Sequence, residues 1–307
     1  HIGYPIIGDG KYGINSVNKE FGFKYQQLTA NQLTFNFKTD SEILNYQSRK
    51  IHVKCYPIGV HPVQLQNQAS DTHLEKLPFN LDTAPPYKTI ISVDRIDYSK
   101  GLLEKIGSLQ SLLEDQPEFK NQFQQLQIAC PCRLDVKTYQ NLYEQFKSAV
   151  QELNTQQGTA DWVPFDCSYD TLGHEALMQL YRKADICWVN SIRDGMNLVA
   201  KEYIAAQDPL DPGILILSKY AGAAEQMREA LLVDPYEHDS MAKALKKALR
   251  MPKSERLERY RYLNQGLKNF DIIRWRDQFI TDLKNSQSLR IYRPVATGAS
   301  TQFSVTA

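Results

Sequence analysis

A polar segment with a single glycine connects a predicted strand to a predicted helix between residues 190 and 198. The apolar run 184–190 has the length and β-branched content of a buried strand, and apolar residues from 198 to 206 repeat at helical spacing. The segment between them contains Asp194 and Gly195. Unpaired N–H groups and the dipole at a helix start favour an anion, so this turn could bind a phosphate or a sugar. An ordinary turn capped by Asp194 explains the pattern equally well.

Two cations follow another predicted strand. Residues 89–93 read as a buried strand, and Arg95 and Lys100 lie in the polar segment behind it. If both strands belong to one parallel sheet, these cations and Asp194 share the edge where the strands end, and ligands bind at that edge in such folds. The forked guanidinium of Arg95 and the compact charge of Lys100 would suit a diphosphate. A solvated loop in which Arg95 pairs with Asp94 or Asp97 is an equally good explanation.

Strands and helices alternate along most of the chain. Such alternation predicts an α/β fold with a parallel sheet covered on both faces. The predicted strands are 89–93, 127–129, 162–165, 186–189, 213–217 and 231–233, and the predicted helices are 102–113, 136–151, 173–183, 197–206, 223–230 and 238–249.

The flanking regions predict the domain limits. Proline and glycine interrupt residues 56–62, which we interpret as a linker. Ahead of the linker we expect strands at 33–37 and 51–56 and a short helix at 41–46, and further helices at 254–267 and 272–283 precede a polar tail from 286. The predicted domains are therefore 1–62, 63–268 and 269–307. Because the chain opens on a strand-like run without methionine, we also expect sequence upstream of it.

Composition narrows the class of protein. The 307 residues include 36 Lys and Arg against 35 Asp and Glu, so no strong general attraction to nucleic acid or acidic membrane is expected. No run of 18 apolar residues and no secretory signal are present, which predicts a cytoplasmic protein. The five cysteines read as reduced thiols, and the spacing Cys130-Pro131-Cys132 is too short for the usual zinc or redox motif. We predict no metal site.

Several segments in order resemble one enzyme family. Residues 93–101 (Val-Asp-Arg-Ile-Asp-Tyr-Ser-Lys-Gly) and 193–203 (Arg-Asp-Gly-Met-Asn-Leu-Val-Ala-Lys-Glu-Tyr) closely resemble the trehalose-6-phosphate synthases, which are retaining glycosyltransferases. Residues 56–60, 133–140, 205–209 and 218–224 also match this family, and the likeness runs from about Lys54 to Lys284.

The resemblance implies an α/β fold of the GT-B type, which has two Rossmann-like domains. Residues 63–268 would form the nucleotide-sugar domain, and 1–62 would be the C-terminal portion of the acceptor domain. Residues 269–307 would supply a helix that crosses back, with a tail.

The resemblance also implies roles for individual residues. Arg95 and Lys100 would bind the diphosphate of UDP-glucose in place of a metal, and Arg133 would bind the phosphate of glucose 6-phosphate. Glu202 would accept from the ribose hydroxyls. The other residues implied to contact the donor are Leu172 at uracil, Asp194, Gly195 and Met196 at glucose, and Asn197, Leu198 and Val199 at the phosphates. His1 would also reach the glucose. The residues implied to be catalytic are His1, Asp194, Arg95 and Lys100.

The implied reaction moves glucose from UDP-glucose to glucose 6-phosphate with retention, giving trehalose 6-phosphate and UDP, with no cofactor. The expected partners are these small molecules, without nucleic acid or membrane, and a homo-oligomer is compatible with the sequence. A transferase with another phosphorylated acceptor and a non-catalytic nucleotide-sugar-binding subunit stay open as alternatives. A nicotinamide enzyme is disfavoured because no Gly-x-Gly-x-x-Gly run follows Val93.

Overall fold

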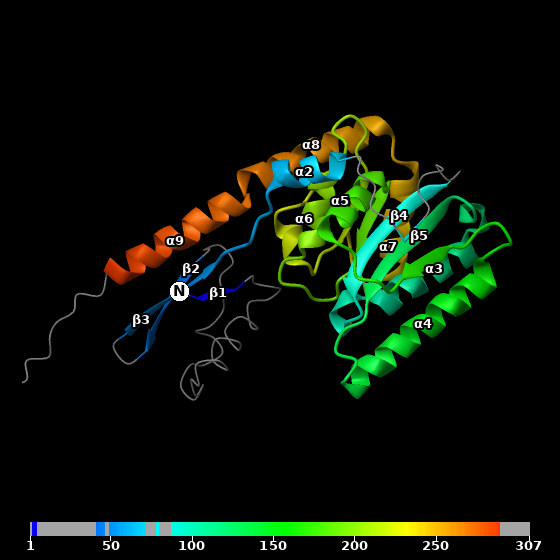
Figure 1. Cartoon of the computed structure of the whole chain (residues 1–307), viewed down its shortest axis with the longest axis horizontal. Coiled ribbons are helices and arrows are strands. Elements are labelled where there is room, and N and C mark those ends of the chain that lie inside the picture. The colour runs from blue at the N-terminus through cyan, green and yellow to red at the C-terminus, as the bar shows by residue number, and fades with distance from the viewer. Residues whose placement is uncertain (1, 5–40, 47–48, 72–77, 80–86, 289–307) are drawn as a thin grey trace, which may run out of the picture.

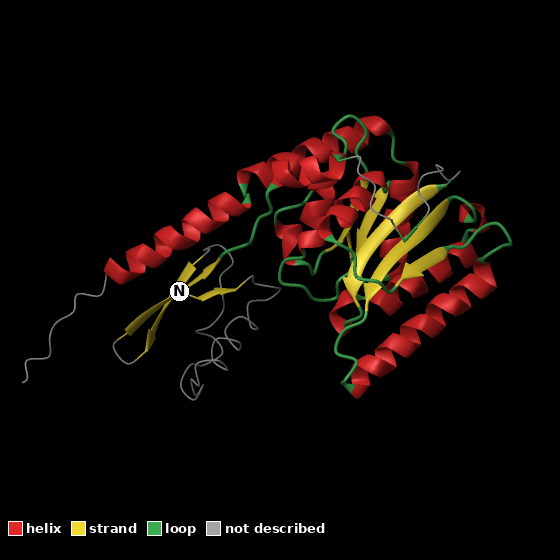
Figure 2. Cartoon of the chain, viewed as in Figure 1, coloured by secondary structure: helices red, strands yellow, loops and turns green. Residues whose placement is uncertain are grey.

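The structure is a computed structural model, and it describes residues 2–4, 41–46, 49–71, 78–79 and 87–288. Two sheets make up the strand content of these residues: a six-stranded sheet within 88–233 and a three-stranded sheet before residue 56. Figure 2 shows the larger sheet between helices, with the smaller sheet to one side of it.

The six-stranded sheet is parallel throughout, as predicted. Its order is β6-β5-β4-β7-β8-β9. Within this sheet the chain first forms the central strand β4, then β5 and β6 on one side of it, and then returns to the other side of β4 for β7. The carboxyl ends of β4 and β7 therefore flank the point where the strand order reverses, which is the usual ligand position in such sheets. The strands are β4 (Lys88–Arg95), β5 (Phe123–Cys130), β6 (Phe165–Ser168), β7 (Ile186–Val189), β8 (Ile214–Ser218) and β9 (Leu231–Val233).

Helices cover both faces of this sheet. Successive strand residues point to opposite faces, so Ile90 packs in one apolar cluster and Ile91 in the other. This burial on both faces explains the continuous apolar runs that revealed the strands. The first face carries α3 (Leu102–Asp115), α4 (Lys137–Gln157) and α7 (His238–Arg250), and the second carries α2 (Pro62–Ser70), α5 (His174–Lys183), α6 (Leu198–Ala206) and α8 (Lys253–Asn269).

Two predicted elements of this region differ in the structure. The helix expected at 223–230 is only a short 3-10 turn, η4 (Gly222–Glu225), in which the backbone N–H groups of Gln226 and Met227 donate to carbonyl oxygens three residues earlier. The strand expected at 162–165 begins instead at Phe165. Trp162 lies in the preceding turn, where its indole N–H donates to the carbonyl oxygen of Phe123 at 2.7 Å.

The three-stranded sheet has the order β1-β3-β2, where β1 is Ile2–Tyr4, β2 is Ser41–Tyr46 and β3 is Arg49–Cys55. β3 runs parallel to β1 and antiparallel to β2. The helix predicted at 41–46 is therefore wrong: pairing with β3 satisfies the backbone of this segment, whereas so short a helix has little stability of its own. The strand predicted at 33–37 lies outside the described residues.

The last described helix, α9 (Ile272–Ser288), runs from the large sheet toward the small one (Figure 1). The Trp275 indole N–H donates to the carbonyl oxygen of Tyr56 at 3.0 Å. Farther along, Asp282 accepts from Lys54 Nζ at 2.6 Å and from the Tyr56 hydroxyl at 2.9 Å. These contacts fix α9 against the segment that leaves β3. The predicted domain limits stay a prediction, and the predicted tail lies mostly outside the described residues.

Candidate active site

The loops that follow β4 and β7 are bonded to each other at the switch point of the large sheet. The backbone N–H groups of Ile192 and Arg193 donate to the Ser99 carbonyl oxygen at 2.8 and 3.2 Å. Gly101 has a φ of 62°, and an added Cβ there would lie 2.2 Å from the Asn190 carbonyl oxygen. The Asn190 amide donates to the Gly101 carbonyl oxygen at 2.8 Å. Only glycine allows this close approach, so it fixes the spacing of the two loops.

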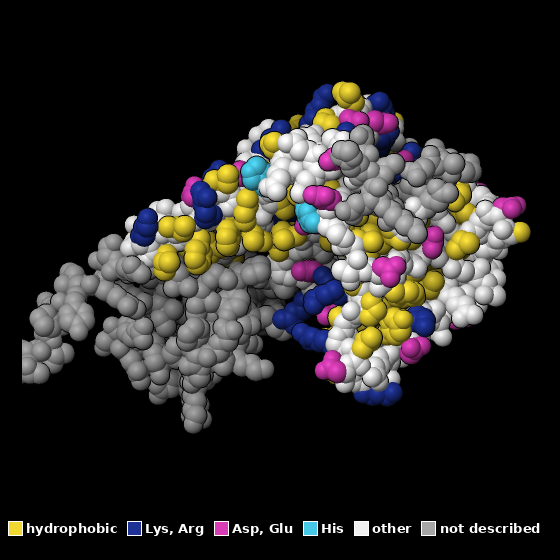
Figure 3. All heavy atoms as spheres, in the orientation of Figure 1, with side chains coloured by type: hydrophobic (Ala, Val, Ile, Leu, Met, Phe, Trp, Pro, Cys, Tyr) yellow, Lys and Arg dark blue, Asp and Glu magenta, His cyan; other side chains and the backbone are white. Residues whose placement is uncertain are grey.

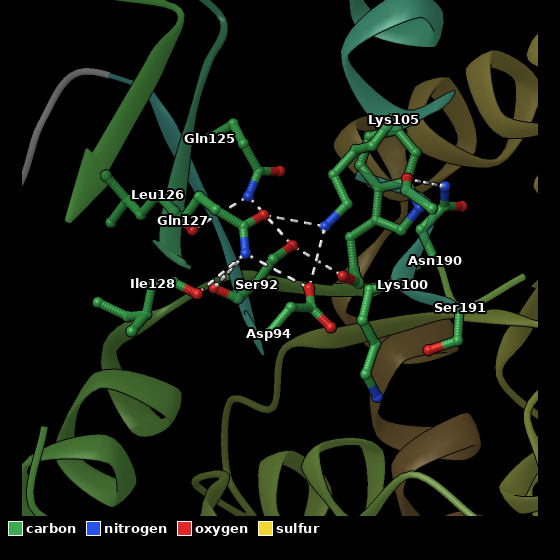
Figure 4. Close-up of polar contacts among 12 residues, drawn as sticks. Ser92, Asp94, Lys100, Lys105, Gln125, Leu126, Gln127, Ile128, Asn190 and Ser191 are labelled. Carbon is green, nitrogen blue, oxygen red and sulfur yellow. Dashed lines mark hydrogen bonds and ion pairs between the residues drawn. The ribbon is translucent and has the colours of Figure 1, made fainter. Parts of the chain in front are cut away.

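Lys100 and Asp194 meet between these loops. The Lys100 ammonium lies 2.5 Å from Asp194 Oδ2, and the two side chains are only 15% and 18% exposed. The carboxylate also accepts from the Ser191 hydroxyl at 3.4 Å, the Asn197 amide at 3.2 Å and the Met196 backbone N–H at 3.3 Å. These donors hold the carboxylate in one orientation. Figure 4 shows Lys100 and Ser191 beside each other at this point.

Asn197 starts helix α6. Its side-chain oxygen accepts from the Ala200 backbone N–H at 3.1 Å, which is the N-cap contact. Its φ is 72°, in the left-handed region that asparagine tolerates better than most residues. The N–H groups of Leu198 and Val199 belong to the first turn of α6, where a helix offers them no partner. The capping residue is Asn197, not Asp194.

The short η4 turn supports this loop from behind. Gly222 N–H donates to the Asp194 carbonyl oxygen at 3.0 Å, and Ala223 N–H donates to that of Met196 at 2.7 Å. An added Cβ on Gly222 would lie 2.2 Å from the carbonyl oxygen of Gly195. The start of this segment, where the sequence predicted a helix, therefore supports the loop that contains Asp194.

The apolar residues of the loop differ in exposure. Met196 is buried, whereas Leu198 is 36% exposed. Leu172 and Val199 are half-buried and pack against the same apolar cluster, which lies beneath α5 and α6. Leu172, in the loop after β6, thus reaches the cluster on which α6 rests.

Glu202 lies one helical turn into α6. Its side chain is 18% exposed, and its Oε1 lies 3.8 Å from Nε2 of His174, at the start of α5. Burial raises the pKa of the Glu202 carboxyl, and His174 opposes this rise. No motif in the sequence points to His174, because only the fold brings it to Glu202.

Arg95 and Arg133 lie at the ends of the neighbouring strands β4 and β5. The Arg95 side chain is 59% exposed, and its ion pair is with Asp97 at 3.9 Å, which is the contact that the solvated-loop interpretation expects. The Arg133 guanidinium lies 5.5 Å from the ring centre of Tyr139 and donates to its hydroxyl at 3.1 Å. On the face shown in Figure 3, Lys and Arg side chains gather beside a hollow at this sheet edge.

A buried polar network lies behind the loop (Figure 4). Lys105 is fully buried, with its ammonium 3.1 Å from Gln127 Oε1 and 3.6 Å from Asp94 Oδ2. Burial lowers the pKa of Lys105, and the Asp94 carboxylate opposes this effect. The network anchors the strand end from which Arg95 emerges. The sequence analysis passed over Lys105 and Gln127 because single polar residues in apolar segments carry no motif.

The sequence profile described as glycosyltransferase family 20 matches residues 18–285. The chain belongs to glycosyltransferase family 20. The trehalose-6-phosphate synthase of Sodalis glossinidius is 39% identical over 249 residues, which are 81% of this chain and 53% of that protein. This family 20 chain therefore spans about half the length of the relatives it matches.

Two solved structures are similar to the chain. One is a UDP-forming α,α-trehalose-phosphate synthase from Burkholderia xenovorans in complex with glucose-6-phosphate, with a TM-score of 0.76 and 39% identity over 80% of this chain and 54% of that one. The other, from E. coli, is bound with UDP-2-fluoro glucose, with a TM-score of 0.74 and 35% identity over 83% of this chain and 59% of that one. These neighbours confirm the α/β fold of the GT-B type.

The structure brings most of the candidate residues to one end of the large sheet, and the roles implied for them stay predictions. Lys100 and the residues from Asp194 to Val199 form one continuous site, Glu202 adjoins it on α6, and Arg95 and Arg133 stand at its edge. His1 lies outside the described residues. Within the described ranges, no group of three His, Cys, Asp or Glu residues could hold a metal ion, and no helix has the length and apolar character needed to cross a bilayer.

Proposed function

We propose that this chain provides the donor site of a family 20 enzyme that transfers glucose from UDP-glucose to glucose 6-phosphate with retention. The products would be trehalose 6-phosphate and UDP. The contact of Lys100 with Asp194 at the switch point carries the proposal, because it puts a cation and a sugar-binding carboxylate beside a free helix start. The ligands named for the two solved relatives, glucose-6-phosphate and UDP-2-fluoro glucose, support the same substrates.

The phosphates of the donor would bind between Lys100, Arg95 and the start of α6. Lys100 is a nearly buried charge, whereas Arg95 is exposed and only loosely paired with Asp97. Arg95 can therefore turn to a ligand at little cost and bind it through two parallel N–H groups. The backbone N–H groups of Asn197, Leu198 and Val199 would add partial positive charge.

The sugar and the ribose would lie on either side of these phosphates. Asp194, with the backbone of Gly195 and Met196, would bind glucose hydroxyls, because its carboxylate is already oriented by three protein donors. Glu202 would accept from the ribose hydroxyls one helical turn away, and Leu172 would border the uracil.

Catalysis would come from charge stabilisation. As the bond between glucose C1 and the phosphate oxygen breaks, the leaving UDP gains negative charge and the sugar becomes oxocarbenium-like. Lys100 and the helix start would be fixed where that charge develops, and Arg95 would turn toward it, so these groups would stabilise the transition state more than the ground state. We propose that these groups take the role of a metal and that no cofactor is needed.

The remaining assignments concern the acceptor and the compartment. Arg133 would bind the phosphate of glucose 6-phosphate after leaving Tyr139, and His1 would reach the donor glucose. Cys130, Cys132, Cys167 and Cys187 form no disulfide, which fits a reducing environment, so we place the reaction in the cytoplasm.

The first experiment measures UDP release from UDP-glucose by this chain, with and without glucose 6-phosphate, alongside calorimetric titration with UDP. Binding of UDP, with release that requires glucose 6-phosphate and yields a phosphorylated disaccharide, would support the whole proposal. Binding without release would limit this chain to donor recognition and favour the non-catalytic alternative. If UDP does not bind, the proposal is wrong at its centre.

A further inference from the structure

Lys201 is a buried cation held only by neutral oxygens. It precedes Glu202 on α6 and is 1% exposed. Its ammonium donates to the Ile58 carbonyl oxygen and to Gln226 Oε1, both at 2.7 Å. Among the residues that the structure describes, no carboxylate forms an ion pair with it, and burial lowers its pKa to about 8. Burying a charge without a counter-ion is costly, so stability alone does not explain a lysine here.

The first acceptor belongs to the segment that joins the two sheets. Residues 56–61 connect β3 to α2, and two contacts tie this segment to α9. The Val60 carbonyl oxygen accepts from Ile272 N–H at 2.9 Å, and that of Tyr56 accepts from the Trp275 indole at 3.0 Å. An added Cβ on Gly59 would lie 2.3 Å from a backbone oxygen of the turn between α8 and α9. Residues 56–61 and the start of α9 thus form one unit, which we term the crossing segment.

The second acceptor belongs to the support of the candidate site. Gln226 directly follows the η4 turn, whose Gly222 and Ala223 donate to the carbonyl oxygens of Asp194 and Met196. The ammonium of Lys201 therefore contacts the crossing segment on one side and the η4 turn on the other. α6 itself begins at Asn197, within the candidate site.

We propose that Lys201 is a positioning residue that couples the crossing segment to the ligand-binding loop 194–197. The coupling runs through Ile58 on one side and through Gln226 and the η4 turn on the other. A shift of the small sheet with α9 would change the support of the loop, and a ligand that orders the loop would restrain the crossing segment. The effect of a ligand on the crossing segment rests on the proposed function, whereas the coupling in the ligand-free chain does not.

The test compares amide hydrogen exchange in the ligand-free chain and in the variant Lys201→Met. Methionine fills nearly the same volume but donates no hydrogen bond, so the variant keeps the packing of the aliphatic part of Lys201 and loses only its hydrogen bonds. We expect exchange to accelerate about tenfold or more at Ile272, in the crossing segment, and at Ala223, in the η4 turn, as is typical for loss of a charged hydrogen bond. Both amides are hydrogen-bonded in the structure.

Arg256→Met is the matched control. Arg256 donates to the Pro212 carbonyl oxygen at 2.6 Å and is 17% exposed, so its loss also removes a largely buried cation from a backbone oxygen. It contacts neither the crossing segment nor the η4 turn through that bond. We expect wild-type exchange at Ile272 and Ala223 in this variant. The proposal is overturned if Lys201→Met accelerates neither amide or only one, or if the control accelerates both.

A second arm adds UDP. In the wild type we expect UDP to slow exchange at Ala223 and also at Ile272, whereas in Lys201→Met only Ala223 should respond. If UDP slows Ala223 but not Ile272 in the wild type, coupling is refuted. If UDP does not bind the wild type, the proposed function fails, and the ligand-free comparison still decides the coupling.

Gln226→Leu supplies a variant at a half-buried position in case Lys201→Met does not fold. It cuts only the link to the η4 turn and leaves the bond to Ile58. We expect UDP to protect Ala223 but no longer Ile272 in this variant. Protection of both amides would contradict the proposed route.

Discussion

Lys100 and Asp194 depend on each other before any ligand is present. Each side chain is less than a fifth exposed, so either charge alone would lose much of its hydration without a partner. Besides its proposed contact with the sugar, Asp194 therefore holds the ammonium of Lys100 in place. The loop donors in turn orient Asp194.

Lys100→Ala should reduce turnover of UDP-glucose by roughly 100-fold or more, because it removes a fixed charge beside the leaving group. Steady-state UDP release measures the effect. Lys253→Ala is the control, since Lys253 is 56% exposed and lies 3.9 Å from Asp211 on the surface. Near-normal turnover in Lys100→Ala would exclude Lys100 from the chemistry.

The buried carboxyl of Glu202 predicts a pH dependence of donor binding. Because burial raises its pKa, the carboxylate is lost at a higher pH than for an ordinary glutamate. In the proposed function the charged form would accept from ribose hydroxyls, so UDP affinity should fall as the pH is lowered from neutral toward the ordinary glutamate value of about 4.3. Calorimetric titration across this range tests the idea.

The variant Glu202→Gln isolates that contribution from all other pH-dependent effects on UDP binding. It should bind UDP more weakly at high pH and show a flatter pH profile than the wild type. Identical slopes for the two proteins would mean that Glu202 does not face the ligand.

At the scale of elements, the η4 turn supports the candidate site through its hydrogen bonds to the loop 194–196. Its glycine is required because the Gly195 carbonyl oxygen would lie 2.2 Å from an added Cβ on Gly222. Since that neighbour is backbone, the loop itself must move to accept a side chain. Fold stability should suffer less than the geometry of the site.

Gly222→Ala should therefore weaken UDP binding by about tenfold or more, which corresponds to about 1.4 kcal/mol. Gly266→Ala is a matched control: its added Cβ would lie 3.8 Å from the nearest atom, the Gln226 carbonyl oxygen. In the last turn of α8 that change should leave affinity unchanged and add at most about 0.5–1 kcal/mol of stability. Equal UDP affinities for the two variants would show that the η4 turn does not support UDP binding.

At the scale of the whole molecule, the sequence patterns predicted those features that depend on neighbouring residues in the chain. The alternation of apolar strands and helices predicted the parallel sheet, and the sheet in turn predicted that Lys100 and Asp194 lie at the same edge. The segment 41–46 was mispredicted because its pairing with the next strand, β3, decides its backbone conformation, and not its own apolar pattern. At 223–230 the helix is missing, and the first backbone groups of the segment bond to the loop near Asp194, which is distant in sequence. The same holds for Lys105, His174 and Gln226, which acquire their contacts only through folding.

The attachment of α9 is a further long-range feature, and it centres on Asp282. Partial burial raises the pKa of this carboxyl, but the hydrogen bonds from Lys54, Gln278 and Tyr56 outweigh burial and lower it overall. A carboxyl with a lowered pKa contributes stability that is complete above its unfolded pKa and is lost as the pH falls through the folded value. The contribution should therefore persist at neutral pH and disappear below about pH 4.

Asp282→Asn should lower the free energy of unfolding by about 1–2 kcal/mol at neutral pH, since it weakens charged hydrogen bonds that are partly exposed. The difference from the wild type should shrink as the pH falls below about 4, because the wild-type carboxyl is then neutral too. Asp277→Asn on the same helix is the control: Asp277 is 60% exposed and pairs with the adjacent Arg276 at 2.8 Å, so its loss should cost about 0.5 kcal/mol or less. Denaturant titrations at both pH values decide the matter. A difference that stays constant with pH would show that Asp282 stabilises α9 by packing and not by charge.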